Sequence, residues 1–127
     1  MLKNSTQKIS YYDIDYEIRD LTKCLNEIDG IETIESCCGH GKDKCYIWFV
    51  VENCEILNKF LFHCFNHEKF WTVCVDTGDP NRTWKDLHLI LISNEICKQS
   101  DFDKLTFRIR ERISDIKMSD EEWSLLK

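Results

Sequence analysis

The sequence predicts an α+β fold with the element order αββαββα, giving a four-stranded, mostly antiparallel sheet with helices on one face. Two observations predict this fold. Apolar residues recur at every third or fourth position in three segments, as on the buried face of a helix, and short runs of β-branched and aromatic residues separate these segments. The 127 residues include only four glycines and one proline, so no flexible linker divides the chain. We therefore expect one domain over residues 1–127.

The first half of the chain predicts a helix followed by a β-hairpin. Residues 14–28 place apolar side chains on one helical face, with Asp13 positioned to cap the helix and Gly30 to end it. Residues 31–38 are rich in β-branched side chains and predict the first strand. Residues 45–51 are apolar on both faces, as in a central strand. The short turn between the two strands makes them a hairpin.

The second half predicts another helix, another hairpin and a final helix. Asn53 is expected to cap the second helix, and residues 70–75 and 87–92 predict two strands joined by a turn-rich loop. Ser100 and Asp103 resemble a capping box at the start of the third helix. A right-handed crossover between the two hairpins makes the second and third strands parallel.

Strand direction predicts which loops lie together. The end of strand one, the starts of strands two and three, and the end of strand four fall at the same edge of this sheet. We therefore expect the turn at residues 36–41 to share an edge with residues 66–69 and 94–95. The loop at residues 77–80 should lie at the far end.

Charge and composition exclude some classes of partner. The net charge of −6 disfavours binding to duplex nucleic acid, although a few local donors can still hold a small anion. No window approaches the ~18 apolar residues of a membrane span, and the first residues lack the apolar stretch of a signal peptide. We expect a cytoplasmic protein without a membrane partner.

Eight cysteines in a cytoplasmic protein are expected to be free thiols. Five of them fall in otherwise apolar elements, where cysteine behaves as a small hydrophobic residue: Cys24, Cys54, Cys64, Cys74 and Cys97. The other three, Cys37, Cys38 and Cys45, gather around the segment Ser36-Cys37-Cys38-Gly39-His40-Gly41. We call this segment the glycine loop.

The glycine loop predicts an anion-binding turn. Gly39 and Gly41 flank His40, and glycine permits the positive φ angles at which successive backbone N–H groups converge on an anion. Lys42 follows directly and adds positive charge. The spacing is not that of a phosphate-binding P-loop, because no helix is expected to follow. A hairpin turn that merely needs glycine geometry is the simplest alternative.

Two kinds of chemistry are further alternatives for the same residues. A zinc site from Cys37, Cys38, His40 and Cys45 is disfavoured, because adjacent strand residues point to opposite faces and the chain has no C-x-x-C motif. We therefore expect no stoichiometric zinc and no other cofactor. The second alternative is a catalytic thiol, in which His40 or His67 activates Cys37 or Cys38.

The stretch from Thr33 to Gly41 resembles small phage and bacterial proteins that carry an S-C-C-G-H-G turn after a T-[IFL]-x start. The resemblance covers roughly residues 25–51. A few residues are also loosely similar to the Ser-Ser-Cys-Ser-Gly segment of the tRNA wybutosine-synthesis methyltransferases, from which this chain departs at Cys38 and His40. The first resemblance implies a phage protein acting in the host cytoplasm. Small phage proteins include anti-defence factors, among them oligomeric sponges that sequester immune nucleotide signals.

Other segments contain arginine and aromatic residues that are candidates for ligand binding or for an oligomer interface. Arg108 and Arg112 are four positions apart on the third helix and suit phosphate, although pairing with Glu111 and Asp115 on a solvated face is the simpler interpretation. Arg82 and Trp84 lie in one loop, where the ring can stack on a base. An aromatic patch and a terminal turn together predict a homo-oligomer seam; these residues are Tyr11, Tyr12, Tyr16 and Trp123, with Ser119 and Glu122 capping the turn.

The sequence thus predicts a non-catalytic binding protein for a phosphorylated, nucleotide-like small molecule. The expected ligand-binding residues are Ser36, Cys38, Gly39, His40, Gly41, Lys42, His67, Arg82, Trp84, Arg108 and Arg112. One alternative is a small enzyme that uses Cys37, Cys38 and His40 on a nucleotide or a tRNA. Another is a protein–protein inhibitor whose acidic surface mimics nucleic acid.

Overall fold

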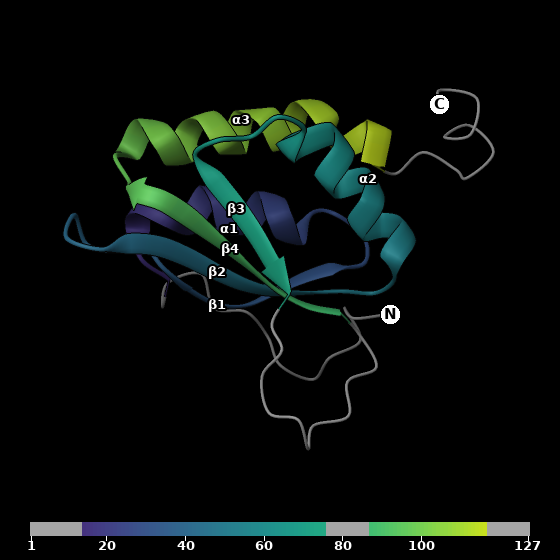
Figure 1. The fold of residues 1–127 in the computed structure, drawn as a ribbon, viewed down its shortest axis with the longest axis horizontal. Helices are drawn as coiled ribbons and strands as arrows, with labels where there is room; N and C mark the ends of the chain where they lie inside the picture. The colour runs from purple at the N-terminus through teal and green to yellow at the C-terminus, as the bar shows by residue number, and fades with distance from the viewer. Residues whose placement is uncertain (1–13, 76–86, 117–127) are drawn as a thin grey trace, which may run out of the picture.

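The computed structural model describes residues 14–75 and 87–116, and within them it confirms the predicted α+β fold (Figure 1). The chain begins with a 3-10 turn and continues through three helices and four strands. Their bounds are Tyr16–Ile18 (the 3-10 turn), α1 Arg19–Asn26, β1 Ile31–Cys37, β2 Lys44–Val51, α2 Cys54–Phe65, β3 Trp71–Val75, β4 Leu87–Ile96 and α3 Gln99–Ile116.

The four strands form one sheet in the order β1-β2-β4-β3, and every neighbouring pair is antiparallel. β2 and β3 run in the same direction, as predicted, but β4 lies between them. β4 is also four residues longer than predicted, because Ile96 still pairs with Lys44 of β2 across a register shift. At the other side of β4, Ser93 pairs with Trp71 at the start of β3.

This pairing confirms the predicted grouping of loops. The turn between β1 and β2, the start of β3 and the end of β4 lie at the same end of the strands, which is the edge of the sheet that the sequence predicted for them. The glycine loop and the turn that precedes β3 therefore share this edge. Residues 77–80, predicted at the far end, lie outside the described residues.

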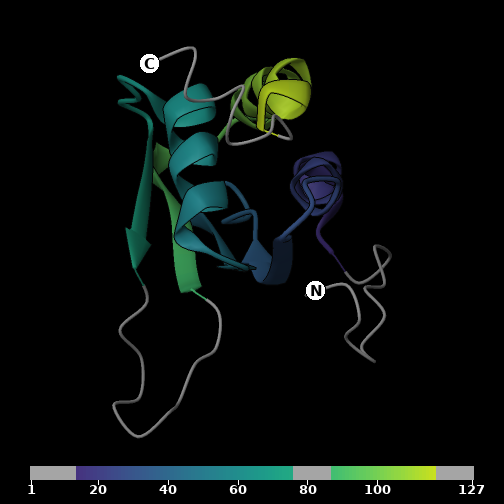
Figure 2. The same cartoon turned by 90° about the vertical axis from the view of Figure 1, so that its right-hand side faces the viewer.

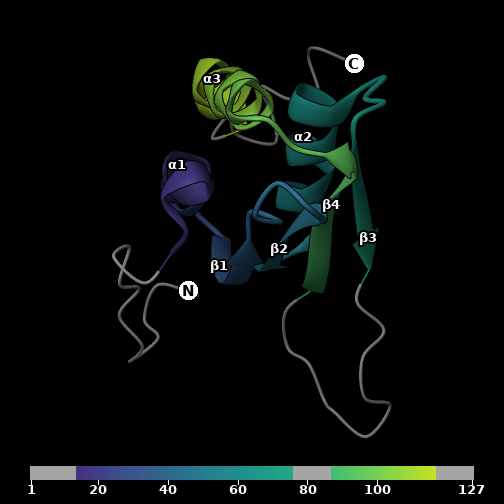
Figure 3. The ribbon, with the colours of Figure 1, turned by 90° about the vertical axis from the view of Figure 1, so that its left-hand side faces the viewer.

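All three helices cover the same face of the sheet (Figures 2 and 3). α1 packs on β1, α2 packs on β2, and α3 lies across both α1 and α2. The core lies between these layers; Phe49 of β2 meets Phe60 of α2 edge to face, with ring centroids 5.9 Å apart. Leu105 and Ile109 of α3 are fully buried in the same core.

The ends of the helices test the predicted caps. Asn53 accepts a hydrogen bond from the backbone N–H of Ile56 at 2.9 Å, which confirms it as the cap of α2. The predicted box of Ser100 and Asp103 is wrong by two residues. The N–H of Lys98 donates to Asp101 at 2.7 Å, so the helix starts earlier. The prediction that Gly30 ends the first helix is also wrong, because α1 ends at Asn26 with Glu27 as its C-cap. The remaining predicted caps, at residues 13, 119 and 122, lie outside the described residues.

All eight cysteines are free, but their environments differ from the prediction in two respects. Cys54 and Cys74 are exposed, because the first starts α2 and the second faces outward from β3. Cys45, predicted near the glycine loop, is fully buried, and its backbone N–H donates to Ser93 of β4 at 2.9 Å. It is therefore a core residue.

Candidate functional site

The glycine loop is a left-handed turn. Three consecutive residues have positive φ angles: 83° at Gly39, 52° at His40 and 74° at Gly41. The carbonyl of Gly39 accepts hydrogen bonds from the N–H groups of Lys42 and Asp43, each at 3.0 Å. A Cβ at Gly39 would lie 2.1 Å from the carbonyl oxygen of Asp43, whereas a Cβ at Gly41 would meet nothing within 4 Å. Gly39 is thus required by space as well as by φ.

Most of the backbone donors of this turn are used inside the protein. The N–H of Cys38 donates to the Asp15 carboxylate at 3.0 Å, and the N–H of His40 donates to Cys38 Sγ at 3.3 Å. The N–H groups of Lys42 and Asp43 both point to Gly39. An anion nest needs converging free N–H groups. These bonds, and the carboxylate of Asp15, argue against the nest that the sequence predicted here.

Asp15 brings a third kind of side chain to the loop. It lies just before the 3-10 turn, 23 positions upstream of Cys38. Its Oδ2 is 3.8 Å from Nε2 of His40, and one ligand atom from each of Asp15, Cys37 and His40 lies within 4.8 Å of the other two. The opposite ring nitrogen of His40, Nδ1, is 3.6 Å from Cys38 Sγ. The loop therefore gathers a carboxylate, an imidazole and two thiols.

The pKa of the Cys38 thiol argues against a nucleophile at that position. The side chain is buried, and this burial raises its pKa to about 11, with the Asp15 carboxylate adding to the effect. The backbone N–H of Cys38 is in turn the main cause that lowers the pKa of Asp15. A catalytic thiol needs a lowered pKa, because the thiolate is the nucleophile. Cys38 is within reach of His40 but stays protonated at neutral pH.

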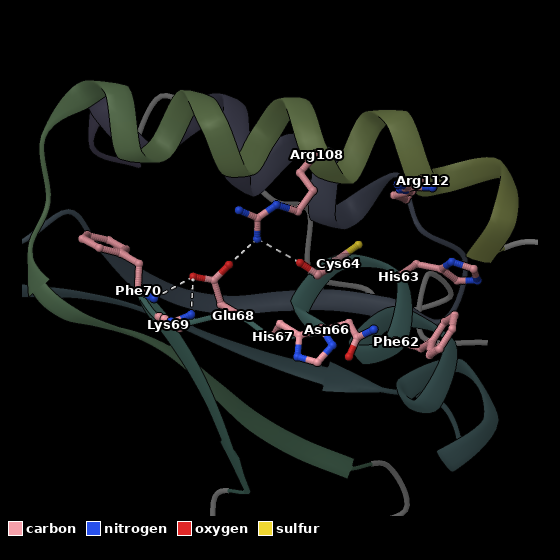
Figure 4. Close-up of a pocket in the computed structure, with 10 residues that line it drawn as sticks. All are labelled: Phe62, His63, Cys64, Asn66, His67, Glu68, Lys69, Phe70, Arg108 and Arg112. Atoms are coloured by element: carbon pink, nitrogen blue, oxygen red, sulfur yellow. Dashed lines mark hydrogen bonds and ion pairs between the residues drawn. The ribbon is translucent and has the colours of Figure 1, made fainter.

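A second candidate site is a pocket of about 730 Å³ between α2, α3 and the turn that precedes β3 (Figure 4). We call it the α2–α3 pocket. His67, Arg108 and Arg112, three of the predicted ligand-binding residues, line it together with Lys69 and the half-exposed ring of Phe62. The pocket also contains the carboxylate of Glu68. The fold thus brings α3 beside the turn that precedes β3, where Arg108 meets Glu68 across 40 residues of sequence.

Arg108 fixes one wall of this pocket. Its Nη1 donates to the carbonyl of Cys64, near the end of α2, at 2.9 Å and also to the Glu68 carboxylate. The predicted alternative partner, Glu111 on the same helix, is therefore not the partner of Arg108. Arg112 does pair with a neighbour on the same helix, as that alternative predicted. Its Nη1 lies 3.8 Å from Asp115, which is a long ion pair.

Glu68 is held by four donors. Besides Arg108, its Oε2 accepts hydrogen bonds from the N–H groups of Phe70 at 2.7 Å and of Lys69 and Trp71 at 3.1 Å each. Burial acts to raise the pKa of this carboxyl, but the bonds from Arg108 and from the backbone outweigh it, and the pKa lies below its usual value. Glu68 is therefore an ionised anchor of the turn.

The neighbouring histidine is neutral. Burial lowers the pKa of His63, and the nearby Arg112 and Lys59 lower it further, against the opposing charge of Asp115. Its ring packs edge to face on Phe62, with centroids 5.1 Å apart. This corner of the pocket therefore presents two aromatic rings beside the charged Arg112.

The predicted ligand-binding residues divide between the two sites. Six belong to the glycine loop or follow it directly: Ser36, Cys38, Gly39, His40, Gly41 and Lys42. Arg82 and Trp84 lie outside the described residues, as do Tyr11, Tyr12 and Trp123 of the predicted seam. Tyr16 of that seam is 77% exposed. Sequence reasoning missed Asp15 and Glu68, which become partners of the loop and of Arg108 only through the fold.

The chain matches no family model, no curated protein and no solved structure. Over residues 14–75 and 87–116, no helix combines the length and the apolar character needed to cross a membrane. Function is therefore inferred from the geometry of the two sites.

Proposed function

We propose that the protein binds a small phosphorylated, nucleotide-like molecule in the α2–α3 pocket, without catalysing its conversion. The observation that supports this most directly is the convergence of His67, Arg108 and Arg112 on one pocket. The sequence pattern marked these residues for anion binding, and they come from separate segments. Lys69, Arg108 and Arg112 outnumber Glu68, the carboxylate of this pocket, and so form a local cationic surface on a chain whose net charge is −6.

Arginine chemistry fits a phosphate at this position. A guanidinium carries five N–H donors in a planar fork that matches phosphate oxygens. The hydrogen bonds of Arg108 to the described residues come from Nη1 alone, and they hold the fork between α3 and the turn (Figure 4). Its remaining donors and the half-exposed guanidinium of Arg112 supply the charge for an incoming phosphate.

The aromatic corner fits a base. Phe62 is 53% exposed although it is a large apolar side chain, and it lines the pocket beside the neutral ring of His63. Stacking of a nucleobase on an aromatic face contributes about 1–3 kcal/mol. The pocket volume of about 730 Å³ also falls within the range typical of small-molecule sites, about 300–1,000 Å³.

Binding without catalysis is supported by the thiol that lines this pocket. Burial raises the pKa of Cys64 to about 12, against the lowering effect of Arg108 and Arg112, so it is not an activated nucleophile. A protein that only sequesters its ligand needs no such group. An oligomeric sponge for immune nucleotide signals, which the resemblance to phage proteins implies, is the specific form of this proposal.

Calorimetric titration with ATP, pyrophosphate and cyclic dinucleotides tests the proposal. Arg112→Ala should weaken binding of the best ligand by about 5- to 10-fold, because one partly exposed charge contact is lost. The matched control is Arg110→Ala, which removes the same charge from an exposed position on α3 that does not line the pocket. Its affinity should stay within about twofold of the wild type.

The two variants separate a site from a general charge effect. If Arg110→Ala weakens binding as much as Arg112→Ala does, the ligand responds only to overall charge. If neither variant changes the affinity, any binding occurs elsewhere on the chain. Either result contradicts the proposed site. Absence of binding by every phosphorylated ligand at millimolar concentration contradicts the function itself.

A further inference from the structure

We propose that Asp15, Cys37 and His40 hold one zinc ion at the glycine loop. One ligand atom of each of these side chains lies within 4.8 Å of the other two. A thiolate, an imidazole and a carboxylate are the three kinds of ligand that zinc takes in proteins. Calcium and magnesium favour sites made only of oxygen, so the sulfur and nitrogen donors favour zinc.

The distances are close to those of a metal site. Ligand atoms that share a tetrahedral zinc lie roughly 3.3–3.8 Å apart, given metal–ligand distances of about 2.0–2.3 Å. The separation of 3.8 Å between Asp15 Oδ2 and His40 Nε2 is only about 0.5 Å longer than the ~3.3 Å expected for an oxygen and a nitrogen ligand of one tetrahedral zinc. The three ligand atoms are at most 4.8 Å apart, so they must come about 1 Å closer to share one zinc ion. Rotation of the His40 side chain, which is 66% exposed, provides that movement.

The backbone of the loop explains how a local sequence forms this cluster. The left-handed turn carries the chain back, so that the His40 ring lies beside Asp15 and Cys38. A non-glycine residue in the left-handed region is uncommon, and such strain gathers at functional sites. A plain hairpin turn places glycine at such a position, whereas this loop keeps a histidine between two glycines.

Cys38 has a supporting position next to this site. In metal sites the second ring nitrogen of a ligating histidine usually contacts a partner that fixes the ring. Here His40 Nε2 faces Asp15, and Nδ1 lies 3.6 Å from Cys38 Sγ. The sequence argued against zinc because Cys37 and Cys38 point to opposite faces. That objection does not apply to a site that uses Cys37 alone and obtains its third ligand from Asp15.

Three protein ligands leave a fourth zinc position for water or for an atom of a bound molecule. This site is separate from the α2–α3 pocket, because none of its residues lines that pocket. The two proposals can therefore fail independently, and a metal titration needs no phosphorylated ligand.

The test is a titration of the full chain, reduced and stripped of metal, with Co²⁺ as a spectroscopic substitute for zinc. The wild type should bind one Co²⁺ per chain, with the near-ultraviolet absorption of a cobalt–thiolate bond, and Zn²⁺ should displace it. Cys37→Ser should abolish this absorption. Asp15→Asn and His40→Asn should weaken binding by about 10- to 100-fold. Both keep the fold, since the amide oxygen introduced by Asp15→Asn still accepts from the Cys38 N–H and asparagine tolerates the left-handed region.

The matched control is Cys54→Ser, which removes an exposed thiol outside the cluster. It should leave both the absorption and the stoichiometry unchanged, and so should Arg112→Ala in the α2–α3 pocket. Thiolate absorption that persists in Cys37→Ser overturns the proposal, as does its loss in Cys54→Ser. Failure of the wild type to bind Co²⁺ or Zn²⁺ at tens of micromolar also overturns it.

Discussion

The glycine loop lies at the same end of the strands as the turn that forms one wall of the α2–α3 pocket, but the two sites are built in different ways. The loop is shaped by its own backbone, through three consecutive positive φ angles and bonds that return to Gly39. The pocket is shaped by side chains from distant segments, with Arg108 joined to Cys64 and Glu68 across 44 and 40 residues. The first depends on chain geometry, and the second depends on charge.

This difference determines which changes each region tolerates. The turn is sensitive to an added atom near its backbone, and among distant residues it depends on Asp15, which accepts a hydrogen bond from the Cys38 N–H. A pocket held by ion pairs is sensitive to the loss of either partner and to pH, because a charge left without its partner in a partly buried place is costly. Two pairs of matched changes, one in each region, and one change followed over pH are expected to show this contrast.

The largest effect is expected for Gly39→Ala. The new Cβ would lie 2.1 Å from the carbonyl oxygen of Asp43, a backbone atom that moves only if the turn opens. The φ angle of 83° adds a further penalty for a residue with a side chain. We expect the free energy of unfolding to fall by about 3–4 kcal/mol. Urea denaturation followed by circular dichroism measures it.

Gly41→Ala is the control within the same turn. Its φ of 74° carries the same conformational penalty, but its Cβ would meet nothing within 4 Å. The expected loss is therefore about 1–2 kcal/mol. Equal losses for the two alanine variants would show that the contact with Asp43 is unimportant and that only the φ angles define the turn.

An intermediate effect is expected for Glu68→Gln in the pocket. Glutamine keeps an acceptor for the backbone N–H groups but removes the charge that pairs with Arg108. At neutral pH the variant should lose about 1–2 kcal/mol of unfolding free energy. The same denaturation experiment measures it.

The pH dependence of that difference identifies its cause. The pKa of Glu68 is lowered in the folded protein, so its contribution is complete above the pKa of the unfolded chain, about 4.3. The contribution is lost as the pH falls through the lowered folded value. The gap between wild type and Glu68→Gln should therefore be constant from about pH 6 to 8 and shrink below about pH 4. A gap that stays constant down to about pH 2 would mean that packing, not charge, is responsible.

Sequence patterns predicted the fold well because local signals agreed with one another. The helical spacing of apolar residues marked α1, α2 and α3, and Asn53 capped α2 as expected. Strand direction then followed from the order of elements. The sequence predicted the burial of cysteines less well, because the residue type and its position in the element indicated different environments. Cys54 and Cys74 were expected to behave as small hydrophobic residues because their elements are otherwise apolar, but both side chains are exposed.

The sequence predicted only some residues of the two candidate sites, because the other residues are brought there from distant parts of the chain. The glycines of the loop are a local signal, and they predicted the positive φ angles at Gly39 and Gly41 but not the one at His40. The partners of that turn and of Arg108 are not local. Asp15 and Glu68 are ordinary acidic residues in the sequence, and only the fold brings Asp15 to Cys38 and Glu68 to Arg108.

The smallest effect on stability is expected for Arg112→Ala, and this expectation separates binding from folding. Its only described ion pair, to Asp115, is 3.8 Å long and its side chain is 55% exposed, so the pair contributes at most about 0.5 kcal/mol. Arg108→Ala should instead cost about 2 kcal/mol, because it leaves the Glu68 carboxylate and the Cys64 carbonyl without their partner. If Arg112→Ala unfolds at the same urea concentration as the wild type, any loss of ligand affinity in that variant belongs to the pocket. A loss of stability comparable to that of Arg108→Ala would instead make Arg112 a structural residue, and the cationic surface would then serve the fold and not a ligand.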